Sequence, residues 1–344
     1  PYLLSGSIDG PTNAFFETAA GFTTTGSSIL SDPAALGKGL LLWRAQTQWL
    51  GGMGIIVLGV AILPLLGVGG VELARAESPG HSPDRLTPRF RETAKRLWWI
   101  YAAFTAAEAL LLAFGDMTLF EAVAHSFTTM STGGFGTDAR SIGAFSAYTQ
   151  WVVIAFMTMA GVSFALHWRG FQDPREYGRS SEFRIYVLII ATASLFFLLG
   201  TLGGAVATTI RDAVFTAVSL VTTTGYVTAD FGQWAVALQI GAVGLMFLGG
   251  MAGSTAGSVK TFRLGILTSA ARNDLRRIVH PRGVFVARLG TDSFEPLTEP
   301  MPEDMAFPTA IAADSFGNLF VADKTGGGIV VIGQNGEFRG RQSA

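Results

Sequence analysis

Cysteine is missing from the 344 residues of this chain. A disulfide framework, a thiolate nucleophile and a cysteine-ligated metal site are therefore excluded. Charge is scarce as well, since only 14% of the residues are Asp, Glu, Lys or Arg and the net charge is −1. So small a net charge gives no reason to expect nucleic acid or an acidic substrate as a partner.

Motifs of catalysis are also missing from the sequence. It has no His, Asp and Glu cluster with the spacing of metal ligands, no glycine-rich phosphate loop and no evident pair of nucleophile and base. We therefore expect a protein that is not an enzyme and that holds no cofactor.

Apolar residues dominate instead, at 49% of the chain. About 20 consecutive apolar residues are needed to cross a bilayer. Five stretches come close to that length, at approximately 40–66, 97–114, 148–168, 183–202 and 234–250. They predict an all-α protein that crosses a membrane several times.

Three short Thr/Gly segments each follow an apolar stretch that is too short to span. The short stretches are 11–22, 118–129 and 207–220, and the segments are 23–27, 131–135 and 222–226. Short helices of this kind survive at membrane depth only where protein or a wet cavity covers them. Their repetition in helix–pore-loop–helix units predicts a pore in which backbone carbonyls replace the water around a dehydrated cation.

Each filter loop of such a pore needs a residue with backbone angles that glycine tolerates. Gly26, Gly225 and one of Gly133 or Gly134 fit, and the aromatic residue that follows favours Gly134 as the partner of Gly225. The alternative, that Thr-Gly pairs simply end helices, explains one loop better than three in the same place. The candidate filter residues are Thr24, Thr25, Gly26, Thr132, Gly133, Gly134, Thr223, Thr224 and Gly225.

Charged residues divide between two sets of loops. Basic residues collect in three of them, as Arg75, Arg85, Arg89, Arg91, Lys95 and Arg96, then Arg169, Arg175, Arg179 and Arg184, then Arg272, Arg276, Arg277, Arg282 and Arg288. We expect these loops to be cytoplasmic. The opposite loops hold the Thr/Gly segments, and their few charged residues are Lys38, Arg140 and Arg211 beside the acids Asp9, Asp32, Asp116, Asp138 and Asp230. Their mildly acidic surroundings would concentrate cations.

Longer stretches carry a family resemblance. They are 43–58, 61–67, 249–257, Phe15-Phe16-Glu17, His125-Ser126-Phe127 and Phe164-Ala165-Leu166-His167. Over approximately residues 13–290 the chain resembles the potassium-uptake membrane subunit of the bacterial Trk system. The resemblance implies an inner-membrane K⁺ transporter with four covalently linked repeats around one pore, usually a homodimer bound to a cytoplasmic nucleotide-binding regulatory subunit.

The resemblance also assigns roles to residues. Gly26, Gly134 and Gly225 match the selectivity filters of repeats one to three, where K⁺ would bind. The segment 249–257 matches a gate loop that interrupts the inner helix of the third repeat, and small residues with little helix commitment suit such a loop. The alternative is a small-residue surface for helix packing. The candidate gate residues are Gly249, Gly250, Gly253, Ser254, Thr255, Ala256 and Gly257.

Several ionisable residues lie within or beside the apolar stretches, and we expect two different roles for them. We expect Glu17, Glu121 and Asp212 to lie at the starts of pore helices, where an acid complements the helix dipole. Arg44, Glu108 and His125 are functional candidates because ionisable groups are costly within a membrane.

The domain organisation departs from the family at both ends. We expect a partial first repeat at 1–66, a second repeat at 67–168, a third at 169–290, and a linker with a short β-rich tail at 291–344 that resembles one blade of an NHL-type propeller. The chain starts at Pro1 without a first outer helix, and no fourth repeat follows residue 290, so we expect a fragment truncated at both ends. The alternative function is a nonconducting remnant that acts at most as a membrane scaffold. The preference for K⁺ over Na⁺, the coupling ion and the regulatory nucleotide stay open.

Overall fold

The computed structural model describes residues 1–57, 89–201 and 210–279 and four strands between 308 and 343. The chain forms two compact units, Pro1–Phe262, here called the helical unit, and Arg263–Ala344, the C-terminal unit. The predicted basic loop around Arg75 and Arg85 and the predicted linker after residue 290 lie outside the described residues.

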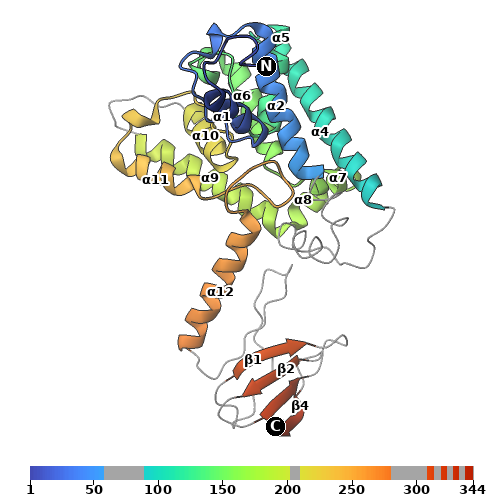
Figure 1. Ribbon diagram of the computed structural model, residues 1–344. Helices are drawn as coiled ribbons and strands as arrows, with labels where there is room; N and C mark the ends of the chain where they lie inside the picture. The colour runs from blue at the N-terminus through green and yellow to red at the C-terminus, as the bar shows by residue number, and fades with distance from the viewer. Residues whose placement is uncertain are drawn as a thin grey trace. The chain divides into compact units, whose positions relative to one another are not determined.

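The helical unit contains one element order three times (Figure 1): a short pore helix, a loop, a 3-10 turn and an inner helix. The first copy has α1 (Pro11–Phe22), η1 (Pro33–Ala35) and α2 (Lys38–Val57). The second adds an outer helix and has α4 (Arg89–Ala113), α5 (Leu119–Met130), η5 (Ser141–Ala144) and α6 (Ala147–Ala160). The third has α9 (Ser181–Thr201), α10 (Ile210–Val221), η6 (Phe231–Gln233) and α11 (Val236–Met246), and α7 (Phe164–Gln172) and α8 (Arg175–Arg179) precede it.

The pore helices α1, α5 and α10 lie where the sequence predicts them. Thr118 caps α5 in a capping box with Glu121, and Asp212 lies in the first turn of α10, as expected of acids at a helix start. The expectation for Glu17 was wrong. It lies in the middle of α1, fully buried, and pairs with Arg44 instead of complementing the helix dipole.

In the part of the chain that the structure describes, fewer helices qualify as membrane spans than the sequence predicts. Among the described residues, Ser181–Thr201 is long and apolar enough to cross a bilayer, and the bent pair α6 and α7 would make a second span. Predicted span 148–168 is therefore not continuous, because the chain turns by 97° between Ala160 and Phe164. Helix α2 leaves the described residues after Val57, inside predicted span 40–66. Helix α11 is shorter than predicted span 234–250.

The core of the helical unit surrounds the pore helices. Phe215 and Val218 of α10 pack with Val153 and Met157 of α6 and with Tyr226 of the loop that follows α10. Helix α5 packs in the same way against α2, α4 and α6. The loops that follow the pore helices are therefore backed by protein, as irregular backbone in a membrane requires.

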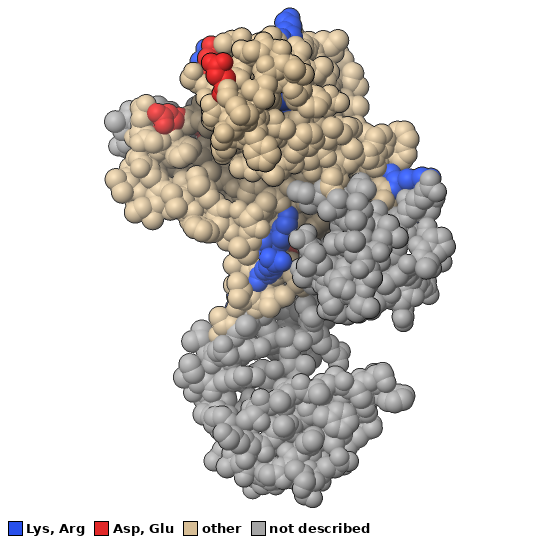
Figure 2. Space-filling model, in the orientation of Figure 1, with Lys and Arg blue, Asp and Glu red and all other residues tan. Residues whose placement is uncertain are grey.

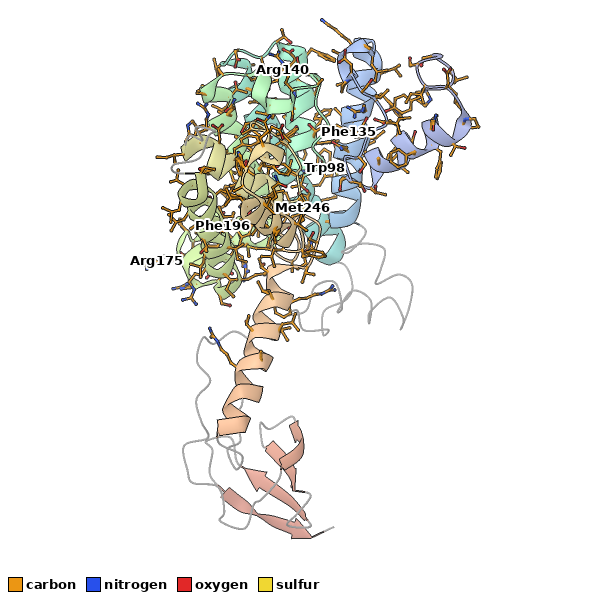
Figure 3. The ribbon with its side chains drawn as sticks, turned by 90° about the vertical axis from the view of Figure 1, so that its left-hand side faces the viewer. Trp98, Phe135, Arg140, Arg175, Phe196 and Met246 are labelled. Atoms are coloured by element: carbon orange, nitrogen blue, oxygen red, sulfur yellow. The ribbon has the colours of Figure 1, made fainter. Side chains whose placement is uncertain are left out.

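The surface of the helical unit suits a membrane. Its described part is almost free of charged side chains in the view of Figure 2, and large apolar side chains such as Leu188, Ile240 and Phe247 are more than half exposed. Arg140 and Arg175 lie at opposite ends of the helical unit (Figure 3). This separation agrees with the charge asymmetry, which places Arg175 on the basic side and Arg140 on the side of the filter loops.

The C-terminal unit contains most of α12 (Thr261–Val279) and one sheet. Strands β1 (Pro308–Ala313), β2 (Leu319–Asp323), β3 (Gly328–Ile332) and β4 (Phe338–Ser343) pair antiparallel in sequence order. The alternation in the sequence thus predicts the strands, and the resemblance to a propeller blade stays a prediction.

Candidate ion site

The loop after each pore helix has the same unusual backbone. A threonine with positive φ stands two residues before a glycine with positive φ, with values between 51° and 80°, at Thr24 and Gly26, Thr132 and Gly134, and Thr223 and Gly225. Gly133 does not have a positive φ. The prediction that Gly134 is the conformational partner of Gly225 is therefore confirmed.

Two successive N–H groups of each loop turn back onto one carbonyl of the pore helix. Those of Thr25 and Gly26 donate to the carbonyl oxygen of Ala20, at 3.1 and 3.3 Å. The carbonyls of Thr128 and Ser219 accept the matching pairs in the second and third loops. Backbone that alternates in the sign of φ gathers its N–H groups on one side and its carbonyl oxygens on the other. The carbonyl oxygens of the loops are therefore expected on the side that faces away from the pore helices.

The three loops lie next to one another. A Cβ atom added to Gly26 would lie 2.1 Å from the carbonyl oxygen of Gly133, and one added to Gly134 would lie 1.9 Å from that of Thr224. The same atom on Gly225 would meet nothing within 4 Å among the described residues. The loops therefore form an arc in the order one, two, three, which is open beyond Gly225.

Threonine hydroxyls tie the first and third loops to their pore helices. In the first loop the hydroxyl groups of Thr25 and Thr23 are hydrogen-bonded at 2.7 Å, and the Thr23 hydroxyl donates to the carbonyl oxygen of Ala19. Thr224 and Thr222 repeat the tie in the third loop, at 2.8 Å. The second loop has Gly133 at the middle position and cannot form this tie.

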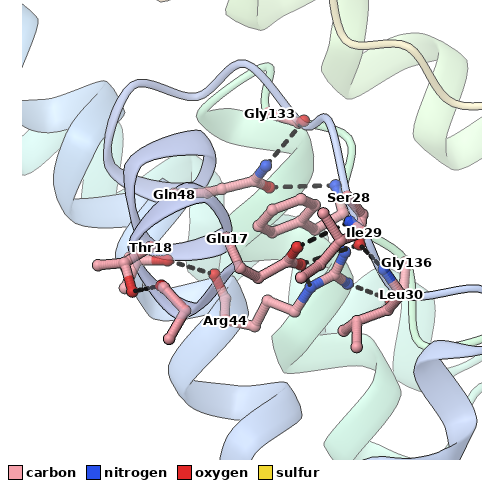
Figure 4. A network of polar contacts seen from close by, with 12 residues as sticks. Glu17, Thr18, Ser28, Ile29, Leu30, Arg44, Gln48, Gly133 and Gly136 are labelled. Carbon is pink, nitrogen blue, oxygen red and sulfur yellow. Dashed lines mark hydrogen bonds and ion pairs between the residues drawn. The ribbon is translucent and has the colours of Figure 1, made fainter. Parts of the chain in front are cut away.

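A buried ion pair links the first loop to the second (Figure 4). Arg44 of α2 donates through Nε to Glu17 at 2.7 Å and through a terminal nitrogen to the carbonyl of Gly136 at 3.2 Å. Its guanidinium also covers the ring of Phe135, 3.6 Å from the centroid. Glu17 in turn accepts hydrogen bonds from Ser28 and from the N–H of Ile29. Both charged groups therefore form hydrogen bonds with residues of the loops. These hydrogen bonds offset the free-energy cost of burying the ion pair.

Tyr226 links the third loop to the second pore helix. Its hydroxyl bonds the hydroxyl of Thr128 and lies 3.5 Å from that of Thr129, and its own carbonyl accepts from Ser219 at 2.7 Å. Tyr226, the aromatic residue after Gly225, therefore joins the third repeat to the second by hydrogen bonds.

The predicted gate segment 249–257 is an ordered loop between α11 and α12. Leu248 and Val259 form a parallel bridge at its base, and Ser254, Thr255 and Ala256 at its tip are buried. One carboxylate oxygen of Glu182, at the start of α9, accepts hydrogen bonds from the N–H of Ala252 at 2.7 Å and from the hydroxyl of Thr261 at 2.9 Å. This oxygen joins the two arms of the loop.

The gate segment reaches the filter loops and the bend between α6 and α7. The N–H of Gly257 donates to the hydroxyl of Thr223 at 2.7 Å, and the hydroxyl of Thr255 donates to the carbonyl of Met130 at the end of α5. Gly161 accepts from the N–H of Met251, and Phe164 donates to the carbonyl of Gly253. The break after Ala160 thus frees the backbone groups that hold the gate segment.

Acidic side chains on the filter side bind nearby backbone. Asp32, Asp138 and Asp230 each accept an N–H group two residues ahead, at 2.8 to 3.0 Å. The hydrogen bond from the Arg140 side chain is the main cause that holds the pKa of Asp138 below its ordinary value. Burial acts to raise the pKa of Asp116, but hydrogen bonds from Thr149 and Ser146 outweigh it and lower the pKa. The lowered pKa values keep Asp116 and Asp138 charged at neutral pH, as the expected attraction of cations requires.

Two other ionisable candidates are buried behind the loops. His125 of α5 donates from Nδ1 to the carbonyl of Glu121 at 2.9 Å. Glu108 of α4 is fully buried, and neither of its carboxyl oxygens makes a hydrogen bond of normal geometry, although Thr129 interacts with it. The described residues hold no group of three His, Cys, Asp or Glu that could bind a metal ion.

Sequence reasoning missed three residues that hold the site. Gln48 bonds the second loop, Tyr226 bridges two repeats, and Glu182 clamps the gate segment. A buried polar side chain in an apolar helix is a recognisable signal for Gln48. The sequence offers no comparable signal for Glu182, whose partners lie 70 and 79 residues away.

Comparison with known proteins gives a consistent result. The family described as TrkH, cation transport protein, matches residues 4–297. The Trk system potassium uptake protein TrkH of Vibrio parahaemolyticus is 40% identical over 304 residues, which cover 84% of this chain and 62% of that protein. The TrkH protein of Escherichia coli K12 is 41% identical over 301 residues with the same coverages, and its TrkG protein is 33% identical over 294 residues, 81% of this chain and 59% of TrkG.

A solved structure shares the fold. The crystal structure of the potassium transporter TrkH from Vibrio parahaemolyticus aligns with a TM-score of 0.72 at 37% identity. The alignment covers 82% of this chain and 59% of the other. The chain therefore spans about three fifths of the length of the proteins that it matches.

Proposed function

The chain belongs to the TrkH family of cation transport proteins, and from this premise we propose that it forms the potassium-conducting part of an uptake system in the bacterial inner membrane. K⁺ would pass inward along the carbonyl oxygens of Thr24 to Gly26, Thr132 to Gly134 and Thr223 to Gly225. The observation that carries the proposal is the repeated backbone of these loops, whose N–H groups face the pore helices. Backbone oxygens in such an array replace the hydration shell of the ion.

The gate segment would control this path. Its tip is buried, and it bonds the hydroxyl of Thr223, the strained threonine of the third loop. Gly249, Gly250, Gly253, Ser254, Thr255, Ala256 and Gly257 would block the path when the loop is docked and open it when the loop leaves. The described contacts favour this function over simple helix packing, because the loop contacts filter residues and a helix bend.

The arc that the three loops form is open beyond Gly225, so a fourth loop would close it. From the family resemblance we further infer a homodimer and a cytoplasmic nucleotide-binding regulatory subunit, and the names of the relatives support only that they belong to a Trk system. The alternative of a nonconducting scaffold rests on the same open arc.

Growth at low potassium tests the proposal. The protein is expressed from its own gene, with the flanking sequence that the gene encodes, in a bacterium that lacks its potassium-uptake systems. We expect growth at low K⁺ together with Rb⁺ uptake, because Rb⁺ fits the same carbonyl sites. A protein present in the membrane at normal abundance that restores neither would contradict the proposal and favour the scaffold.

A further inference from the structure

Gln48 of α2 touches the second filter loop rather than its own. The side chain is fully buried. Its amide nitrogen donates to the carbonyl oxygen of Gly133 at 2.8 Å, and its amide oxygen accepts the N–H of Phe135 at 3.1 Å. The two hydrogen bonds lie on either side of Gly134, the glycine with positive φ, and Figure 4 shows the one that joins Gln48 to Gly133.

The amide of Gln48 fits this position in one orientation. Turned over, its oxygen would face the oxygen of Gly133 and its NH₂ group would face the N–H of Phe135, so both contacts would be repulsive. The network therefore fixes which atom is oxygen and which is nitrogen.

Gln48 also explains why the second loop has two glycines. A Cβ atom on Gly133 would lie 2.3 to 2.7 Å from three atoms of the Gln48 amide. The first and third loops have Thr25 and Thr224 at this position, and both are tied through hydroxyls to the end of their pore helix. In the second loop the glutamine occupies the space of that threonine side chain and provides the hydrogen bonds in its place.

The inner helices of the other repeats do not offer this amide. Met157 and Met246 stand as far beyond the 3-10 turns η5 and η6 as Gln48 stands beyond η1. Met157 is buried against Tyr226, the residue after the third filter glycine. Among the three described loops, an inner-helix glutamine thus supports only the second.

We propose that Gln48 is a positioning residue for ion selectivity, which holds the second filter loop in the conformation that the first and third loops reach through threonine pairs. The proposal rests on the proposed function, since the filter must be the selective element. A carbonyl array selects among ions only while its oxygens keep their number and spacing, and a site is held in place by the groups that support it. The second lone pair of the Gly133 oxygen remains for the ion.

The first experiment asks whether Gln48 holds the loop, and it needs no transport. The purified protein in lipid nanodiscs is compared with Gln48→Met, which copies the other inner helices, by hydrogen exchange of the segment 131–137. The amide of Phe135 should exchange about tenfold faster in Q48M, as expected when a buried hydrogen bond is lost. Gln46→Met is the matched control, because Gln46 lies on the same helix and is exposed. Equal exchange in Q48M and the unchanged protein would overturn the proposal.

The second experiment asks whether the support sets selectivity. At equal abundance, Q48M should lower the ratio of K⁺ to Na⁺ uptake about three- to tenfold, because both hydrogen bonds from Gln48 to the loop are lost. Adding Gly133→Thr to Q48M recreates the threonine and methionine of the third loop, with Ser131 as hydroxyl partner, and should recover most of the ratio. An unchanged ratio in Q48M, or no recovery in the double variant, would overturn the proposal.

Failure of the proposed function would look different. In that case the unchanged protein would not transport K⁺ at all, while the exchange experiment would still report on the support by Gln48. If Q48M does not accumulate, the isosteric Gln48→Glu replaces it. The carboxylate of Q48E would keep the acceptor for Phe135 but lose the donor to Gly133, so the amide of Phe135 should stay protected while the ion ratio falls, and an unchanged ratio would overturn the proposal.

Discussion

Gly134 and Gly225 share a backbone angle but not their surroundings. Both have a φ near 80°, which strains any residue with a Cβ atom. At Gly134 the added Cβ would also lie 1.9 Å from the carbonyl oxygen of Thr224, whereas at Gly225 it would meet no described atom within 4 Å. A substitution at Gly225 therefore tests backbone strain alone, whereas one at Gly134 also tests the spacing between the second and third loops.

Alanine at these two positions should have unequal effects. Gly225→Ala should cost about 1 kcal/mol of strain and leave much of the K⁺ preference. Gly134→Ala should abolish the preference for K⁺ over Na⁺, because the second and third loops must move apart. The measurement is the ratio of K⁺ to Na⁺ uptake at equal abundance, with the exposed Gly37→Ala as control. Equal ratios in G134A and G225A would contradict the loop arrangement.

Asp116 gives a prediction about pH. It accepts three hydrogen bonds at 2.7 Å, from the N–H and hydroxyl of Ser146 and from the hydroxyl of Thr149, at the start of α6. The pKa of Asp116 is lower in the folded protein than its ordinary value. Its stabilising contribution is therefore present above the unfolded pKa of about 3.9 and is lost as pH falls through the folded pKa.

Replacement of Asp116 by Asn should follow this dependence. We expect D116N to lower the free energy of unfolding by about 1 kcal/mol at neutral pH, because a partly exposed hydrogen-bonded carboxylate is lost. The difference from the unchanged protein should shrink below about pH 4. Thermal melts in detergent over a pH series measure it, and a constant difference down to about pH 3, below the unfolded pKa, would contradict the assignment.

The residue scale also shows what the sequence could predict. Glycine needs no partner to adopt a positive φ, so Gly26, Gly134 and Gly225 were recognisable. Thr24, Thr132 and Thr223 were not, because threonine is β-branched and rarely adopts such angles. Their conformation depends on hydrogen bonds to pore helices and neighbouring elements, which no local pattern indicates.

At the scale of elements, the gate segment is an ordered loop whose two arms share one anchor, Glu182. Its carboxylate oxygen holds the N–H of Ala252 and the hydroxyl of Thr261. The loop is thus fixed by a side chain that comes from the opening turn of α9 and not by helix propensity.

Removal of the Glu182 carboxylate should favour the open gate. We expect Glu182→Ala to raise Rb⁺ uptake several-fold at equal abundance, because the hydrogen bonds from Ala252 and Thr261 to the carboxylate are lost and the docked loop is less stable. Glu182→Gln keeps an acceptor oxygen and should change uptake less. Lower uptake in E182A than in the unchanged protein would mean that the docked loop is the conducting form.

Element boundaries were predictable where local chemistry sets them. Pro11, Thr118 and the apolar runs after them mark the pore helices. The break between α6 and α7 was not predictable from residues 148–168, because those residues are apolar almost throughout. It exists because the gate segment, far along the chain, bonds the freed backbone groups of Gly161 and Phe164.

At the scale of the whole molecule, the open arc of filter loops limits what these residues do alone. Carbonyl oxygens on one side of the arc have no neighbouring loop among the described residues. An ion there would keep part of its water on one side, and exposed backbone would face lipid at a cost of several kcal/mol per group. The sequence predicts the repeats of this arc, but not that contacts between loops bring glycine and carbonyl within van der Waals distance.

Residues 1–344 expressed alone should therefore not restore growth of a potassium-uptake-deficient bacterium at low K⁺. The same residues joined to a fourth helix–pore-loop–helix repeat should restore it, because the ring of carbonyl oxygens would close. Growth is measured at matched membrane abundance. Growth with residues 1–344 alone would show that three loops, or two chains together, are enough.

The contacts between filter loops also bear on how the protein is made. Gly26 meets Gly133, and Gly134 meets Thr224, so each loop finds its neighbour only after about a hundred further residues have left the ribosome. Until then the strained threonines are held only by hydrogen bonds to their own pore helices, such as that from the N–H of Thr24 to the carbonyl of Gly21. With these loops as the proposed filter, a nascent chain that has inserted one or two repeats would lack the full set of carbonyl oxygens, and we expect it to leak no cations.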